Sequence, residues 1–174
     1  MGRNRRIKIK GRKAAYHVTV RTTQHHFGLN DHMKRFFISK LLELDNLFFS
    51  EIGFFCSMSN HIHLLIRFIH PDKVDPDSAV FRWNRYHPRT YQKNRTVDAD
   101  REYVRRSLTD ISFFMKKLNT LMTREYNRMT GHSGTLWERR FRSAIVERGK
   151  ASLLTGAYID LNSFRASLVS QPEN

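Results

Sequence analysis

Cysteine and long apolar runs are scarce in this 174-residue chain. The single cysteine, Cys56, excludes an internal disulfide and a zinc site built from several cysteines. No run approaches the roughly 20 apolar residues that a membrane-spanning helix needs. The basic N-terminus has no apolar stretch behind it, so a secretory signal is not expected. We therefore predict a reducing, cytoplasmic setting and no membrane partner.

Acidic residues are also scarce: the chain has 16 Asp and Glu but 31 Lys and Arg, which gives a formal net charge of +15. So strong a positive field attracts polyanions, and nucleic acid is the commonest polyanion that such a protein meets. A hydrophobic content of 40% with 13 Phe is typical of a globular protein. The length predicts one domain over residues 1–174.

Two segments differ in composition from the rest. Residues 1–13 are densely basic, which favours either an arm that contacts phosphates or a solvated tail. Proline is rare, but three of the four prolines fall between positions 71 and 88, among dense charge. We interpret residues 71–106 as an insertion within the domain, because so long a connection is unusual in a compact fold.

Hydrophobic periodicity predicts seven helices and strands. Alternating or β-branched segments predict strands, and apolar residues spaced three and four apart predict helices. The predicted elements are a strand at 15–22, a helix at 32–49, strands at 52–56 and 58–68, a long helix whose apolar face runs from Val104 to Met129, a strand at 136–146 and a helix at 153–161. The first six match the split βαβ pattern, so we predict an α+β, ferredoxin-like fold. It has a four-stranded antiparallel sheet with helices on one face and an additional C-terminal helix.

Within residues 71–106, the run from Phe81 to Tyr86 interleaves aromatic residues with arginines. That mixture is suited to stacking bases while neutralising phosphates. It is equally typical of a short helix that packs its aromatic side chains on the domain. The sequence leaves both interpretations open.

Two histidines, His61 and His63, lie in the predicted strand at 58–68. Successive strand side chains point to opposite faces, so the two imidazoles share one face. Such a pair is suited to bind a metal ion, although an isolated His-x-His is more often an ordinary half-exposed strand.

A second pair, Tyr158 and Asn162, is spaced four residues apart in the predicted final helix. This spacing places both side chains on one helical face, where they offer a phenol nucleophile and an amide oxygen. A phenol ordinarily titrates near pH 10, so it needs assistance to attack at neutral pH. Seen alone, such a pair on a terminal helix usually means packing and a helix cap.

Four segments together resemble the single-tyrosine HUH transposases, and most closely the REP-associated tyrosine transposases and related insertion-sequence enzymes. These are Tyr16–Arg21, Ser59–Leu65, the Gly-x-x-Trp-x-x-Arg-Phe segment Gly134–Phe141 and the helical segment Ala157–Ala166. The resemblance covers nearly the whole chain, with the four segments in the same order.

The resemblance implies that His61 and His63 bind a divalent metal ion, with Asn162 as third ligand and Tyr158 as nucleophile. It implies cleavage of single-stranded DNA at or near a hairpin, strand transfer through a 5′-phosphotyrosine, and a monomer or homodimer. It also implies Mg²⁺ or Mn²⁺ as cofactor, whereas two imidazoles alone favour zinc or manganese. The alternative is a domesticated or non-catalytic protein that binds single-stranded or hairpin nucleic acid.

The segment that enters the strand at 136–146 supplies the candidate DNA-binding residues. Arg139, Arg140 and Arg142 are expected to contact phosphates, so replacing all three should weaken the salt dependence of binding. Trp137 is expected either to stack on a base or to pack in the core.

Overall fold

The computed structural model describes residues 15–23, 28–86 and 97–162. Its sheet has the strands β1 (Ala15–Arg21), β2 (Ser50–Ser57), β3 (His61–Phe68) and β4 (Arg142–Val146), in the order β2-β3-β1-β4 with every neighbouring pair antiparallel. This is the strand order of a ferredoxin-like domain, so the predicted fold class is confirmed. The basic arm predicted at residues 1–13 lies outside the described residues.

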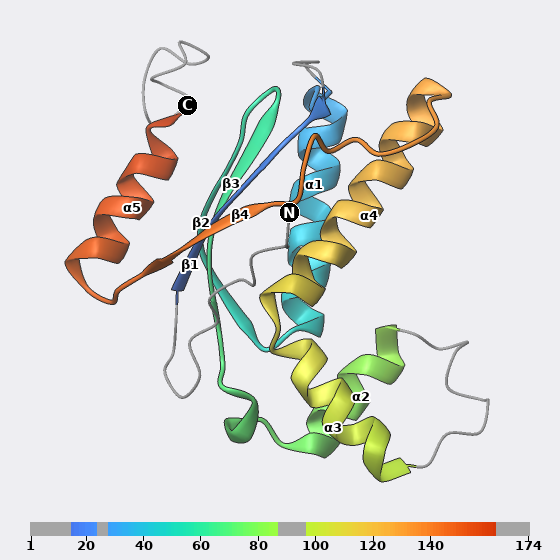
Figure 1. Cartoon of the computed structure of the whole chain (residues 1–174), viewed down its shortest axis with the longest axis vertical. Coiled ribbons are helices and arrows are strands. Elements are labelled where there is room, and N and C mark those ends of the chain that lie inside the picture. Colours follow the sequence, from blue (N-terminus) through green and yellow to red (C-terminus); the bar gives the residue numbers. More distant parts are fainter. Residues whose placement is uncertain (1–14, 24–27, 87–96, 163–174) are drawn as a thin grey trace, which may run out of the picture.

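Two helices, α1 (Asp31–Leu47) and α4 (Ile111–Thr130), cover one face of the sheet (Figure 1). Alternate residues of the two central strands point into this layer, among them Val18 and Val20 on β1 and Ile62 and Leu64 on β3. They pack against helix residues such as Phe37, and the result is the main hydrophobic core. At the helix ends, His32 Nε2 lies 2.7 Å from Glu125 Oε1 and links α1 to α4.

The long helix predicted from Val104 to Met129 is wrong as a continuous element, because the structure divides it into α3 (Val97–Leu108) and α4. Asp110 causes the break. Its Oδ1 accepts hydrogen bonds from the backbone N–H groups of Ser112 (2.8 Å) and Phe113 (3.0 Å), which caps a new helix N-terminus. The apolar period continues across the break, and for that reason the period did not reveal the break.

The strand predicted at 136–146 is shorter in the structure, where β4 begins at Arg142. Before it, Trp137 makes an isolated bridge to Thr22. The indole of Trp137 is buried, and its Nε1 donates to the backbone carbonyl of Asn119 on α4 at 3.1 Å. The segment is therefore held against the helix layer before the chain returns to the sheet.

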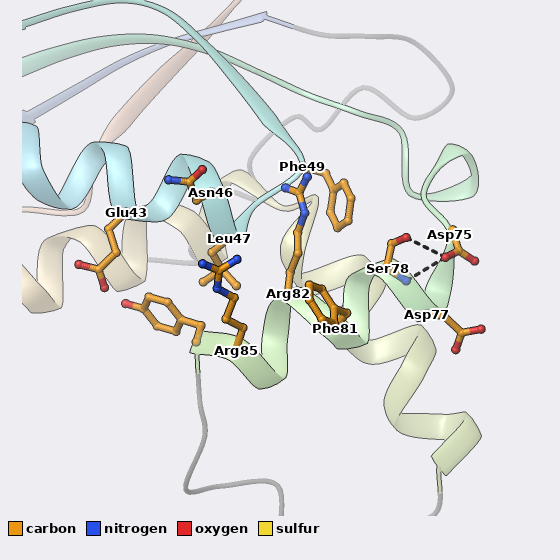
Figure 2. A pocket seen from close by; sticks show the side chains of 11 residues that line it. Glu43, Asn46, Leu47, Phe49, Asp75, Asp77, Ser78, Phe81, Arg82 and Arg85 are labelled. Carbon is orange, nitrogen blue, oxygen red and sulfur yellow. Dashed lines mark hydrogen bonds between the residues drawn. The ribbon is translucent and has the colours of Figure 1, made fainter.

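Residues 71–106 contain the 3₁₀ helix η2 (Pro71–Lys73), the helix α2 (Pro76–Tyr86) and most of α3. On α2, Trp83 stacks on Phe113 with ring centroids 5.7 Å apart, and Lys117 lies 4.6 Å from the ring of Tyr86. The helix-packing interpretation thus holds for these two aromatic residues. Phe81, in contrast, is 67% exposed beside a pocket of about 1020 Å³ between α1 and α2 (Figure 2).

The opposite face of the sheet carries α5 (Lys150–Asp160), which stands apart from the other helices (Figure 1). Its contact is small: Ile159 is fully buried in a cluster with Ala15 and Leu65. Gly156 permits this approach, since a Cβ atom built on it would lie 2.4 Å from Cε2 of Phe54 on β2. None of the helices in the described part of the chain has the length and apolar character needed to cross a lipid bilayer.

Candidate active site

The sheet face beneath α5 carries the two histidines of β3. His61 and His63 alternate with buried Ile62 and Leu64, and their ring centroids are 4.9 Å apart. Strand register adds neighbours on the same face, because directly paired residues of antiparallel strands share a face. Arg21 pairs with His61, and Thr19 pairs with His63. The expected placement of both histidines on one face is therefore confirmed.

Each histidine has a hydrogen-bond partner at Nδ1. His61 Nδ1 lies 2.7 Å from Oδ1 of Asn60, which can only accept, so Nδ1 carries the hydrogen and Nε2 keeps its lone pair. His63 Nδ1 lies 3.0 Å from Nε2 of His17 and 3.3 Å from Oγ1 of Thr19. The rings of His17 and His63 are stacked with centroids 5.2 Å apart. These contacts fix the orientation of both imidazoles.

The electrostatic environment keeps these imidazoles neutral. His63 is only 6% exposed, and burial is the largest cause of a pKa that is lowered to about 4. Repulsion from His61, His17 and Arg21 adds to the effect. Burial also lowers the pKa of His61 and of His17. At neutral pH the cluster therefore offers ring nitrogen lone pairs rather than positive charges.

Helix α5 holds Tyr158 over this cluster. The phenol ring centroid lies 5.9 Å from that of His63 and 6.1 Å from that of His17, both in edge-to-face arrangements. Ile159 is buried against the sheet, so Tyr158, the residue before it, lies at the edge of the contact between α5 and the sheet. Tyr158 is 40% exposed, so its ring meets both the histidines and solvent.

Asn162 lies beyond the end of α5. Its side-chain Nδ2 donates to the backbone carbonyl of Tyr158 at 2.7 Å, so the two residues four apart in the sequence are in contact. The bond satisfies a carbonyl at the helix C-terminus and engages the amide nitrogen, so Oδ1 is the side-chain atom that a cation could use. The neighbouring positions Ser163 onward lie outside the described residues.

The donor set fits a cation only in part. Two neutral imidazoles fixed on a central strand are suitable ligands for a divalent transition metal. In the described ranges, no group of three or more His, Cys, Asp or Glu side chains is arranged to hold a metal ion. Within that part of the chain, ligands beyond the two imidazoles would be amide or water oxygens, or oxygens of the substrate.

The candidate DNA-binding residues divide between two surfaces. Arg142 pairs with Thr19, which also pairs with His63, so Arg142 lies in the same cross-strand row as His63 and on the same face. Arg139 and Arg140 instead line a groove beside α4. Trp137 is 6% exposed, so its ring packs in the core, one of the two placements expected for it.

Two residues of this face, His17 and Arg21, were not predicted from the sequence. Both lie on β1, whose other face carries Tyr16, Val18 and Val20. The strict alternation of β1 was the available signal, since it places His17 and Arg21 together on the second face. Their proximity to the histidines of β3 depends on the register between two strands more than 40 residues apart. The alternation within one strand does not predict that register.

Comparisons with known proteins were made at the level of sequence and of structure. No family model matches the chain, and no curated protein matches it. A solved REP-associated tyrosine transposase bound to a REP hairpin is similar over 99% of this chain and 78% of its own, with a TM-score of 0.63 and 15% identity. A crystal structure assigned as a transposase from Deinococcus radiodurans R1 covers 92% of this chain and 96% of its own, with a TM-score of 0.46 and 17% identity. The chain therefore has the fold of a REP-associated tyrosine transposase.

Proposed function

We propose that this chain is a DNA transposase that cleaves single-stranded DNA at or near a hairpin and transfers the cut strand. One observation carries the proposal: the phenol of Tyr158 lies 5.9 Å from the ring of His63, although the two residues are far apart in the sequence. The similarity to a transposase bound to a REP hairpin supports hairpin DNA as the partner.

In the proposed reaction, Oη of Tyr158 attacks the phosphorus of the scissile phosphodiester. The bond from phosphorus to the 3′ oxygen breaks, which leaves a 5′-phosphotyrosine, and the released 3′ oxygen takes up a proton. The phosphodiester energy is retained in the new bond, so a second 3′-hydroxyl can reverse the step and join a different strand. The exposure of Tyr158 leaves the phenol accessible to such a substrate.

His61 and His63 would hold a divalent cation, Mg²⁺ or Mn²⁺, with Oδ1 of Asn162 as a third ligand. When bound, the cation polarises a phosphate oxygen and orients the scissile bond. Imidazole ligands favour Mn²⁺ over Mg²⁺, because Mg²⁺ prefers oxygen. Arg21 on β1 and Arg142 on β4 lie on the same sheet face as the pair, both on the β1 side of β3, and would bind phosphates beside the cut.

The test is covalent capture of labelled single-stranded DNA that carries a hairpin, with Mn²⁺ present. The unmodified protein should form an adduct that survives denaturation, and Tyr158→Phe should form none, because it lacks the attacking oxygen. Tyr103→Phe is the matched control, since Tyr103 is 53% exposed on α3 and should leave the adduct unchanged. An adduct with Tyr158→Phe would show that another residue is the nucleophile.

Variants of the proposed metal ligands separate an enzyme from a binding protein. His61→Ala and His63→Ala should abolish the adduct, and raising Mn²⁺ should restore part of it. Asn162→Ala should have a smaller effect, because water can replace one neutral ligand. If the unmodified protein binds the hairpin tightly but never forms an adduct, the chain is a non-catalytic hairpin-binding protein instead.

A further inference from the structure

The pocket of about 1020 Å³ between α1 and α2 lies at the opposite end of β3 from His61. Phe49 lines it, and the carbonyl of Phe49 accepts a hydrogen bond of 2.9 Å from the N–H of Ile69, just past the end of β3. The eight residues of β3 place its two ends about 23 Å apart, at about 3.3 Å per residue. The pocket is therefore a separate place from the Tyr158 face.

Two arginines line the pocket from α2. Figure 2 shows the side chains of Arg82 and Arg85 extending from α2 toward the end of α1. The guanidinium of Arg82 lies over the ring of Phe49, 4.1 Å from its centre, and Nη1 donates to the carbonyl of Phe48 at 2.8 Å. Arg82 is thus held in place. Arg85 is exposed, and no ion pair or hydrogen bond engages it within the described ranges.

Phe81 gives the pocket an open aromatic ring. It is 67% exposed, and it lies four residues before Arg85, so the two side chains share one face of α2. The other aromatic residues of this helix, Trp83 and Tyr86, are occupied by packing against α4. An accessible ring with a free arginine one turn away suits one unpaired nucleotide, because the ring stacks on the base and the arginine binds the phosphate.

Three acidic residues also line the pocket, and each already has a partner. Oδ2 of Asp75 accepts from the N–H and the hydroxyl of Ser78, both at 2.8 Å. Oδ1 of Asp77 lies 3.0 Å from Nη1 of Arg101, and Glu43 pairs with a lysine of its own helix. Asp77 is also eight positions before the free arginine, about 12 Å along the helix. These carboxylates therefore leave the C-terminal end of α2 suitable for a phosphate.

We propose that this pocket binds an unpaired nucleotide of a DNA strand, with the base on Phe81 and a neighbouring phosphate on Arg85. The inference rests on the proposed function for the choice of DNA. Every base has a π-face, so the site tolerates any sequence. In a duplex the faces of the bases are covered by one another, so the site selects unpaired DNA. A strand cut at Tyr158 would thus be held at a second point, beyond the far end of β3.

The test is equilibrium binding in EDTA, so that it does not depend on metal or cleavage. The probes are an oligothymidine strand, an abasic strand of equal length, a DNA duplex and an oligouridine strand. The test variants are Phe81→Ala and Arg85→Gln. The matched control is Ile38→Ala with Lys34→Gln, which removes an exposed apolar side chain and a cation, also four residues apart, from the part of α1 that does not line the pocket.

A third variant, Phe81→Trp, reports stacking directly. It should keep the affinity for oligothymidine, since an indole also stacks on a base. The emission of its added indole should be quenched by oligothymidine and not by the abasic strand. The unmodified protein gives the background from Trp83 and Trp137. A residue that only supports the fold of α2 would show no such quenching.

Phe81→Ala should bind oligothymidine about 5-fold or more weakly, while its affinity for the abasic strand stays within twofold. Arg85→Gln should weaken binding of both strands and lower the slope of log affinity against log salt by about 0.7. Duplex binding should change less than twofold in either variant, and the control should match the unmodified protein.

No loss with Phe81→Ala, an equal loss on the abasic strand, an equal loss in the control, or no quenching of Phe81→Trp would each overturn the proposal. A loss confined to oligouridine would overturn the choice of DNA. If these losses are found in a protein that forms no covalent adduct, only the proposed cleavage is contradicted. If the adduct forms and Phe81→Ala binds normally, only this second site is contradicted.

Discussion

Removing the imidazole of His17 tests whether this residue positions His63 for metal binding. His17 contacts His63 at Nδ1, 3.0 Å away, and stacks on its ring. When Nδ1 of His63 donates its hydrogen to His17, the Nε2 lone pair is left for a cation. Loss of such a partner of a metal-binding histidine typically costs about 10–100-fold in metal affinity, or about 1.4–2.7 kcal/mol.

The measurement is Mn²⁺ affinity in the absence of DNA, by calorimetry or electron paramagnetic resonance. His17→Ala should weaken binding by that factor, and His17→Gln should restore part of it, because its amide oxygen can accept the same hydrogen. His63→Ala should abolish Mn²⁺ binding and gives the lower limit of the measured affinity. If His17→Ala binds Mn²⁺ within twofold of the unmodified protein while His63→Ala does not bind it, His17 does not position the ligand.

Two further predictions concern packing and acid stability. Gly156→Ala should slow adduct formation by about 10–100-fold, because its Cβ would lie 2.4 Å from the ring of Phe54 and displace Tyr158. Adding Phe54→Ala to this variant should recover the rate of adduct formation. If the rate is not recovered, the clash with Phe54 is not the cause. Hydrogen bonds from Arg128 and His32 lower the pKa of Glu125 to about 2, below its ordinary 4.5. The stability that this carboxylate contributes is therefore full above about pH 4.5 and is lost as the pH falls toward 2. Denaturant titrations of Glu125→Gln should show a flatter loss of stability over that range, and an unchanged acid dependence would contradict the assignment.

Much of this fold was predictable because strand and helix periods are local properties. The alternation around His61 and His63 predicted that they share one face of the strand, and the order of helices and strands predicted the four-stranded antiparallel sheet. The break at Asp110 had a local signal too, an Asp directly before a helical run, but the continuous apolar stripe concealed it. Periodicity reports which face is buried and does not report whether the backbone is continuous.

The contacts that complete the candidate site depend on long-range register. His17 reaches His63 across 46 residues, and Arg142 joins their row only because β1 lies between β3 and β4. Trp137 was ambiguous for another reason: an aromatic residue among arginines suits a base or a core equally well. Only the approach of α4, which offers the Asn119 carbonyl, decides for the core.

The unequal covering of the two sheet faces has a consequence for local unfolding. Two long helices bury the Val18 and Leu64 face, whereas α5 is held to the other face largely by Ile159 and the close contact at Gly156. An element with so few buried contacts opens at a lower free energy than the strands beneath it. Amide hydrogens of α5 should therefore exchange with solvent well before those of β1 and β3. A helix that detaches in this way would carry Tyr158, and any strand joined to it, while the two histidines stay fixed on the sheet.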